Sequence, residues 1–369
     1  MKDALSSVMN VKDNKNMTFF IIGGVLILIC IIIIIYFSFF YNNGGSSYVE
    51  LRNTLEKAAI NYCDDNCGNL FGGVTTITVP ARTLIDGGYM REFNKGDETT
   101  CDGEVVIKKA YAGYNYITDL DCGENSLKNI YDTIVENASI VDNGSGLYEM
   151  NDSKVYRGEY VDNYLKLGNT MFRIVKLNND NTLMLVLDDY NKNTESKWDD
   201  RYNSNVKRND GINDYSISRA RETLTNIISN LYAEDIGKKA MSYDYCIGSR
   251  GLADASNDGS IECVSKFNDY ISLLTVYDFI NASIDGGCKS VDNSKVCQNY
   301  NYLDSYSEAF WTLTPVKDTT NDVYYYDGSS LVEDKAKTKH SLRFVITISG
   351  EEKYKSGTGT FEDPYVIYE

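Results

Sequence analysis

A run of 22 uncharged residues at positions 19–40 constrains this chain more than any other feature. At about 1.5 Å per residue, a helix of this length spans the roughly 30 Å hydrocarbon core of a bilayer. We therefore expect a transmembrane helix at residues 18–41, in contact with the lipid bilayer through residues 19–40 and preceded by a cytoplasmic tail at residues 1–17. The alternative is a cleaved signal peptide, whose apolar region is usually shorter, about 7–15 residues.

The cysteines indicate on which side of the membrane the rest of the chain lies. Of nine cysteines, Cys30 lies in the apolar run and the other eight form couples that are close in sequence. An even set of this kind is typical of disulfides in an oxidising compartment. We expect a single-pass type II protein of the cell membrane with extracellular C-terminal domains. Sequence alone leaves 105 pairings of eight cysteines open, and proximity favours Cys63–Cys67, Cys101–Cys122, Cys246–Cys263 and Cys288–Cys297.

Zinc is the alternative use of the first four cysteines. Cys63, Cys67, Cys101 and Cys122 could supply four thiolates to one metal ion. The two-residue spacing of a zinc knuckle is missing from this set, however. Disulfides are therefore the favoured interpretation.

Charge and composition limit the class of partner. The net charge is −17, and an acidic surface repels phosphate backbones, so nucleic acid is not an expected partner. Hydrophobic residues make up 43% of the chain, which is ample for packed cores. The length beyond the apolar run is that of two domains.

The pattern of elements predicts an α+β fold with antiparallel strands. Residues 47–62 read as a helix that continues the membrane helix as a stalk, and strands are predicted near residues 74–79, 104–108 and 114–120. Apolar runs at 170–177 and 182–187, joined by four Asn and Asp residues, predict a hairpin. An amphipathic helix is predicted at 216–232, and Thr275 with Asp278 forms a capping-box pattern. We expect a domain at 46–123, a linker at 124–155 and a second domain at 156–369.

The first domain resembles the stalk and small head of pilin-like surface proteins. The resemblance covers about 75 residues, and its matching segments are LEKAA at 55–59, LIDGGY at 84–89, CDG at 101–103 and DCG at 121–123. It implies a long helix packed on a small antiparallel sheet, and self-association through the stalk helix. The glutamate of a prepilin processing signal is missing after Thr18.

The second domain resembles an uncharacterised family of surface domains in low-GC Gram-positive bacteria, related to the C-type lectin-like fold. The matching segments are LGNTMFRIV at 167–175, WDDRY at 198–202, GINDY at 211–215, FWTLTP at 310–315, SLRFVI at 341–346 and YKSGTGT at 354–360. The resemblance implies an α+β domain with antiparallel strands. It implies no activity.

The sharpest local motif is an acidic loop at residues 254–262. Its oxygen-bearing side chains recur at every second position, with glycine sixth and an apolar residue eighth, which is the spacing of an EF-hand-type calcium loop. The twelfth position is Ser265 in place of a bidentate glutamate. The hypothesis is a weak calcium site made by Asp254, Ser256, Asp258, Ser260 and Glu262, and the alternative is a solvated turn.

Two tryptophans offer a second candidate site. Trp198, Asp199 and Arg201, together with Trp311, could line a ligand groove, because aromatic planes with polar neighbours suit sugars and peptides; the alternative is that both indoles are core residues. The one histidine, His340, lies in a lysine-rich stretch that we expect at the surface, without a nucleophile motif, so catalysis is not expected.

The sequence therefore favours a membrane-anchored binding or adhesion protein of the cell surface whose ligand is a glycan or a protein. The alternatives are a structural component of the envelope or of a pilus-like assembly, and an exported enzyme. Apart from calcium, no cofactor is expected.

Overall fold

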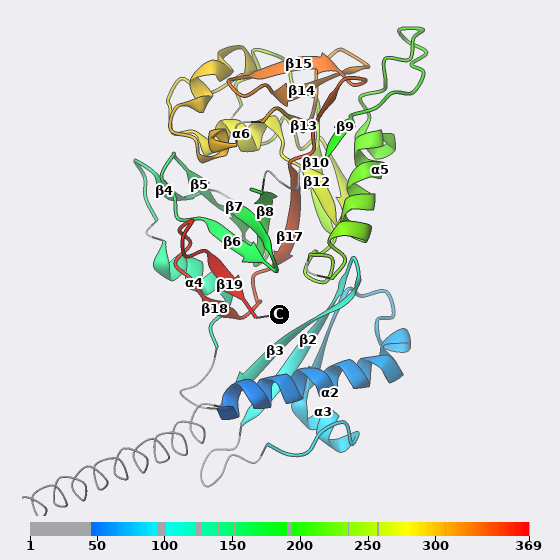
Figure 1. Cartoon of the computed structure of the whole chain (residues 1–369), viewed down its shortest axis with the longest axis vertical. Helices are drawn as coiled ribbons and strands as arrows, with labels where there is room; N and C mark the ends of the chain where they lie inside the picture. The colour runs from blue at the N-terminus through cyan, green and yellow to red at the C-terminus, as the bar shows by residue number, and fades with distance from the viewer. Residues whose placement is uncertain are drawn as a thin grey trace, which may run out of the picture.

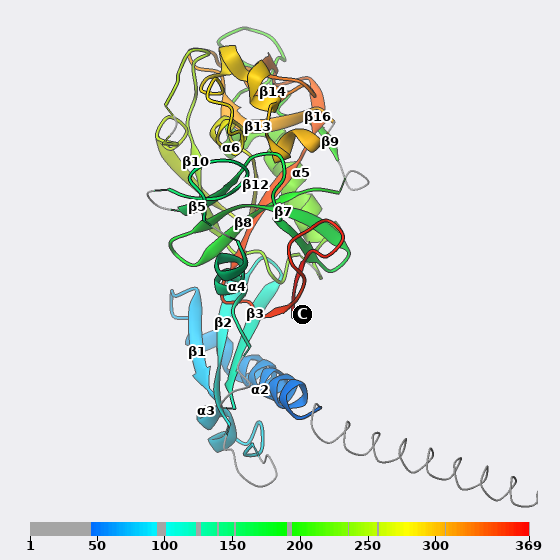
Figure 2. The ribbon, with the colours of Figure 1, turned by 90° about the vertical axis from the view of Figure 1, so that its left-hand side faces the viewer.

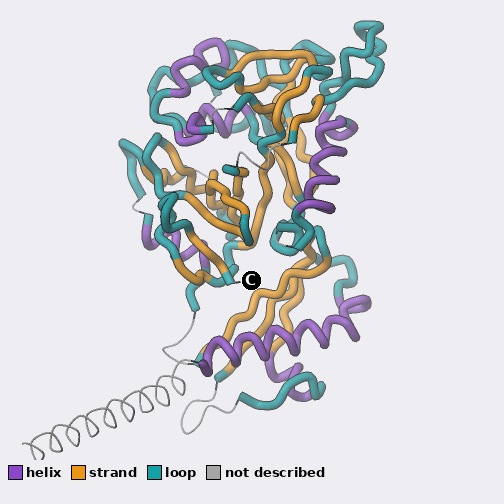
Figure 3. The backbone as a smooth tube through the Cα atoms, viewed as in Figure 1, coloured by secondary structure: helices purple, strands orange, loops and turns teal. Residues whose placement is uncertain are grey.

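The computed structural model describes residues 46–93, 101–122, 127–138, 140–150, 153–189, 194–234, 236–256, 258–306 and 308–368. The apolar run at 19–40 and the tail at 1–17 lie outside these residues. Among the helices of the described residues, none is long and apolar enough to cross a membrane. The architecture is mixed α+β with mostly antiparallel sheets, as the sequence predicts. Figure 3 shows strands throughout the molecule and few helices.

Residues 46–122 form what we call the stalk unit. Its elements are α2 (Ser46–Leu70), β1 (Thr76–Pro80), α3 (Ala81–Asp86), β2 (Asp102–Ala110) and β3 (Gly113–Asp121). The three strands form one antiparallel sheet in the order β1-β2-β3, and α2 packs across it (Figure 1). Leu55 and Ala59 of α2 are fully buried against Val105, Ile107 and Leu120 of the sheet.

Residues 127–368 form the head unit, whose centre is a nine-stranded sheet. The sheet runs β12-β17-β8-β7-β6-β19-β18, with β5 paired to β7 and β4 paired to β5. Its strands are β4 (Gly146–Glu149), β5 (Ser153–Arg157), β6 (Tyr164–Leu167), β7 (Thr170–Asn178), β8 (Thr182–Leu187), β12 (Ile271–Leu273), β17 (Phe344–Ser349), β18 (Tyr354–Ser356) and β19 (Tyr365–Ile367). All strand pairs in this sheet are antiparallel except β6–β19. The last strand of the chain, β19, therefore lies next to β6 in the sheet, far from it in sequence.

A second sheet of five strands lies at the end of the head farthest from α2 (Figure 1). Its order is β15 (Leu331–Lys335), β14 (Asp322–Tyr326), β13 (Phe310–Pro315), β16 (Lys339–Ser341) and β9 (Glu195–Lys197). The strands β10 (Tyr243–Ile247) and β11 (Ser265–Asp269) form a separate two-stranded antiparallel sheet. The helices of the head are α4 (Ile130–Asn137), α5 (Arg219–Asn226) and α6 (Val276–Ala282), with shorter turns η2 (Tyr215–Ile217), η3 (Ile227–Leu231), η4 (Val291–Gln298) and η5 (Tyr302–Ser305).

Two expectations about elements are corrected. The stretch 124–155 is not a linker, because α4 and β4 place Ile130, Ile134 and Leu147 in the core of the head, where they are fully buried. The helix expected at 216–232 begins at Arg219, because the Ser218 side chain accepts the backbone N–H of Arg221 and caps it there. It continues beyond Asn226 as a π-helical stretch.

Four disulfides are present, and they are the four favoured by proximity: Cys63–Cys67, Cys101–Cys122, Cys246–Cys263 and Cys288–Cys297. Each joins two cysteines of the same unit. The four thiols of the zinc alternative are consumed by the first two bridges.

The two units meet at a junction (Figure 2), where backbone hydrogen bonds and the ion pairs Lys108–Glu351 and Lys353–Asp119 cross between them. Ala112 donates its backbone N–H to the carbonyl of Gly237. The ammonium of Lys239 lies 2.9 Å from the Glu352 carboxylate, whose other oxygen accepts the side-chain amide of Asn115 on β3. Glu352 is 2% exposed, so this ion pair is desolvated. Burial raises the pKa of nearby Glu56 on α2, while Arg52 and Lys239 lower it and Glu352 raises it.

Candidate functional site

The acidic loop predicted to bind calcium is organised by an internal cation. The guanidinium of Arg250, itself fully buried, donates to the backbone carbonyls of Asp254 and Ser256 at 3.1 and 2.7 Å. Its Nη1 also contacts Glu262, the only member of the predicted ligand set that is buried. The positive charge of Arg250 therefore occupies the position among the loop's carbonyls that a metal ion would need.

The remaining predicted ligands point elsewhere. Asp254 accepts the backbone N–H of Gly251 at 2.8 Å, and Asp258 accepts the Ser256 hydroxyl and the Ser260 N–H. The hydrogen bonds to Asp258 hold its pKa well below the ordinary value, and the bond from Ser256 has the largest effect. In the part of the chain that the structure describes, no group of three or more His, Cys, Asp or Glu residues could hold a metal ion. The geometry therefore favours the alternative of an internally bonded acidic turn.

The tryptophans of the predicted groove are core residues. Trp198 and Trp311 are both 0% exposed, and their indole N–H groups donate to the carbonyls of Thr312 and Ser196. Asp199 is also buried, and it pairs with Arg201 at 2.8 Å while accepting the N–H of Ile212. The groove predicted around these four residues is thus not formed, and the core alternative describes them.

His340 is not the surface residue that the sequence suggested. Its side chain is 13% exposed and stacks on the Tyr325 ring, with centroids 3.9 Å apart. The Trp311 ring packs edge-on against the imidazole, with centroids 4.5 Å apart. The Nε2 atom of His340 lies 2.9 Å from the Asp334 carboxylate. The strand β16 turns this side chain toward β13 and β14, and the imidazole is held on several sides.

A groove that sequence reasoning missed lies on the head unit. Three loops border it: residues 159–162 after β5, residues 298–305 around η5, and residues 360–362 between β18 and β19. Tyr164 of β6 and Arg173 of β7 complete its lining, and its volume is about 580 Å³. We call it the aromatic groove.

Arg173 supplies the positive charge of the aromatic groove. It is 3% exposed, its Nε donates to the side chain of Asn163, and its Nη2 donates to the carbonyl of Val161. The guanidinium lies 3.8 Å from the centroid of the Tyr164 ring and 4.9 Å from that of Tyr302. Burial lowers the pKa of Arg173, and nearby carboxyl and phenol groups raise it. No hydrogen bond from Nη1 is formed within the described residues, so this donor remains for a ligand.

Aromatic and acidic side chains form the rim of the same groove. Tyr160 is 81% exposed and Phe361 is 61% exposed, and Phe361 packs edge-on against Tyr164. Large apolar side chains gathered at a concave site are a mark of binding surfaces. The lining carboxylates are Glu159, Asp162, Asp304 and Glu362. Burial raises the pKa of Asp304, although its hydrogen bond from Tyr326 lowers it.

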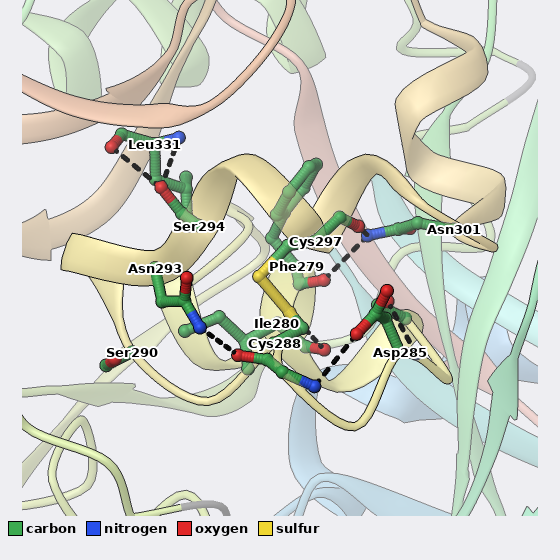
Figure 4. The surroundings of a disulfide bond; sticks show 12 residues. Phe279, Ile280, Asp285, Cys288, Ser290, Asn293, Ser294, Cys297, Asn301 and Leu331 are labelled. Carbon is green, nitrogen blue, oxygen red and sulfur yellow. Dashed lines mark hydrogen bonds between the residues drawn. A yellow bond between two sulfur atoms is a disulfide. The ribbon is translucent and has the colours of Figure 1, made fainter.

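The disulfide Cys288–Cys297 (Figure 4) directly precedes Gln298, the first residue of the segment 298–305 that lines the aromatic groove. It closes the segment that leads from α6 into η4, and the chain then reaches Asn301. The side-chain amide of Asn301 donates to the carbonyls of Phe279 and Cys297, both at 2.9 Å, and its oxygen accepts the N–H of Leu303. Asn301, which directly precedes Tyr302, is therefore hydrogen-bonded both to α6 and to the disulfide-linked Cys297.

The side chains that line this groove offer both donors and acceptors of hydrogen bonds, together with exposed rings. A guanidinium can donate to hydroxyl or carbonyl oxygens, carboxylates can accept from hydroxyls, and exposed rings can cover an apolar face. Four carboxylates against one guanidinium disfavour an anion. The signal available in the sequence was the presence of Tyr160 and Phe361 in loops that also contain glycine and acidic residues.

Comparisons with protein-family models, curated proteins and solved structures found no match to this chain.

Proposed function

We propose that this chain is a membrane-anchored cell-surface protein whose head unit binds a neutral glycan in the aromatic groove. The observation that carries the proposal is that two exposed aromatic residues, Tyr160 and Phe361, line the same groove as a nearly buried arginine, Arg173. A pyranose ring has an apolar face that packs on an aromatic plane and hydroxyls that need both donors and acceptors. Arg173 and the rim carboxylates supply these two kinds of partner.

The same proposal includes a finer description of the fold and its location. The stalk unit is pilin-like, which is supported by its sequence resemblance and by a 25-residue helix packed on a three-stranded sheet. The head unit is C-type-lectin-like, which is supported by its sequence resemblance. The disulfides favour an oxidising, extracellular setting for both units. The apolar run at 19–40 would then place the chain in the cell membrane as a type II protein.

A glycan array probed with the full-length chain in detergent micelles tests the proposal. We expect binding to a restricted set of neutral glycans, and at least tenfold weaker binding by Tyr160→Ala and by Phe361→Ala. Both side chains are exposed, so neither change disturbs the core. The matched control is Tyr202→Ala, because Tyr202 is 59% exposed and does not line the groove.

Three outcomes would contradict this function. The first is an array without any bound glycan. The second is equal loss in Tyr202→Ala, which would show general stickiness of exposed rings. The third is binding to surface proteins that persists after their glycans are removed enzymatically, which would make the ligand a protein.

A further inference from the structure

A second cavity lies in the head unit beneath the loop that the Cys246–Cys263 disulfide closes. Its volume is about 240 Å³, and it shares no lining residue with the aromatic groove. The ribbon β10–β11 and the loop before β11 form one side of it. The strands β5 and β7 and the helix α6 form the other side. We call it the acidic cavity.

Glu262 is the unusual member of this lining. Its side chain is 2% exposed, and its Oε1 is paired with Arg250. Its Oε2 is buried and has no hydrogen-bond partner within the described residues. A buried acceptor without a donor is costly, and such groups in native proteins are few and call for an explanation. The orphan oxygen therefore points to a donor that the protein itself does not provide.

Asp278 of α6 is the second buried carboxylate that lines the acidic cavity. Its Oδ2 accepts both the backbone N–H and the hydroxyl of Thr275 in a complete capping box, which orients the side chain. Its Oδ1 lies 3.5 Å from the ammonium of Lys176. Asp244 and Asp258 also line the cavity, with Lys176 and Lys266 as the only positive side chains in the lining as described. The lining thus carries four carboxylates against two ammonium groups.

We infer that the acidic cavity binds a small molecule through a protonated primary amine, received by Glu262 Oε2 and supported by Asp278. An ammonium group brings three N–H donors and one positive charge, so it satisfies the orphan oxygen and offsets the negative lining together. A hydroxyl brings one donor and no charge. A metal ion is disfavoured, because the described carboxylates do not gather in groups of three. This site is independent of the glycan groove.

The test uses the full-length chain in detergent micelles with n-butylammonium, and 1-butanol as an uncharged molecule of the same shape. We expect saturable binding of the amine by isothermal titration, and at least tenfold weaker binding of the alcohol. Equal affinity for both molecules, or no saturable amine binding, would overturn the inference. This comparison needs no variant, so it stands even if a cavity variant fails to fold.

Two substitutions of lining residues should act in opposite directions. Glu262→Gln should weaken amine binding at least tenfold, because the amide offers a weaker, uncharged acceptor. Lys176→Met should strengthen amine binding, because the ammonium that competes for Asp278 is removed. The methionine side chain is similar in length to that of lysine. Unchanged or weaker binding in Lys176→Met would contradict the inference.

The acidic surface of the protein is the main confounder, and a charge-matched control addresses it. Glu149→Gln removes one negative charge from a side chain that is 67% exposed, and it should leave amine binding unchanged. A loss as large as that in Glu262→Gln would mean general attraction to the surface and would overturn the inference. Phe361→Ala should bind the amine normally, so failure of the glycan proposal and failure of this one are separable.

Discussion

At the scale of single residues, Arg250 shows how a metal-like loop can be built without a metal. The alternating oxygens of residues 254–258 and the sixth-position glycine are the pattern of a calcium loop, yet the carbonyls of Asp254 and Ser256 converge on a guanidinium. Burial raises the pKa of Glu262, while the charge of Arg250 lowers it and that of Asp278 raises it. The pair Arg250–Glu262 therefore stabilises the loop only while both partners are present.

Arg250→Met should lower the free energy of unfolding by about 3–5 kcal/mol at neutral pH, because it leaves Glu262 buried and unpaired. The loss should shrink as the pH falls. A carboxyl whose folded-state pKa is raised binds its proton more tightly in the fold, so its contribution to stability declines as the pH rises from about 4.5. Without Arg250 that pKa rises further, and the deficit grows with pH. Urea unfolding between pH 4 and pH 8 measures this.

The control is Arg219→Met, which breaks exposed pairs with Glu222 and Asp200 and should change stability little at any pH. The double variant Arg250→Met with Glu262→Gln should recover part of the loss. A deficit that is independent of pH would refute the assigned role of Glu262.

At the scale of elements, the disulfide between Cys288 and Cys297 ties η4 to the segment that follows α6. The helix α6 begins at a complete capping box, and its Phe279 carbonyl accepts the side-chain amide of Asn301 just after η4 (Figure 4). Such a bridge acts mainly by restricting the unfolded chain. We also expect it to limit the motion of Tyr302 and Asp304 in the folded protein, because Cys297 closely precedes them in the chain.

Cys288→Ser with Cys297→Ser should cost about 3 kcal/mol, given a sequence separation of 9 residues, and it should weaken glycan binding as well. The matched control is Cys63→Ser with Cys67→Ser, a bridge within α2 with a separation of 4 residues. It should cost about 2 kcal/mol and leave binding intact. Thermal unfolding and the glycan array measure the two effects, and equal loss of binding in both variants would contradict the expected restraint on Tyr302 and Asp304.

At the scale of the whole molecule, a buried ion pair of the head unit holds a side chain of the stalk unit. Lys239 belongs to the head and reaches Glu352, which also accepts from Asn115 of the stalk sheet. The more exposed pair of Lys353 with Asp119 lies nearby, with the aspartate side chain 56% exposed. Asn115 is thus bonded to both members of the desolvated pair Lys239–Glu352, and loss of either member would leave a costly uncompensated buried charge beside it.

Lys239→Met should lower stability by about 3–5 kcal/mol, because Glu352 is left buried without its cation, and it should weaken the coupling of the units, because Asn115 of the stalk sheet loses its bond from the ammonium. We expect one calorimetric transition of the full chain to separate into two. Lys128→Met, which removes an exposed ion pair with Glu136 within the head, should change stability by less than about 1 kcal/mol. A single transition that is merely shifted would show that the coupling does not depend on this pair.

The sequence predicted features that depend on local chemistry. The hairpin of β7 and β8 follows from an Asn- and Asp-rich turn, in which Asn181 adopts a φ of 60°, and α6 follows from Thr275 and Asp278. The disulfides followed from proximity in sequence. The aromatic groove could not be predicted, because Tyr160, Arg173 and Phe361 come from segments that only the pairing of β6 with β7 and β19 brings together. Burial of Ile130 likewise depends on tertiary packing.

The confinement of every disulfide to one unit has a mechanical consequence. If the chain is anchored in the membrane as proposed and is pulled through its head, tension passes across the junction, where the pair Lys353–Asp119 and backbone hydrogen bonds join the units. The stalk unit is cross-linked by Cys63–Cys67 and Cys101–Cys122. The head unit is cross-linked by Cys246–Cys263 and Cys288–Cys297. We therefore expect the junction to separate under force before either unit unfolds, because each unit keeps its disulfides. The separated chain would be longer, and the two units could associate again once the force is removed.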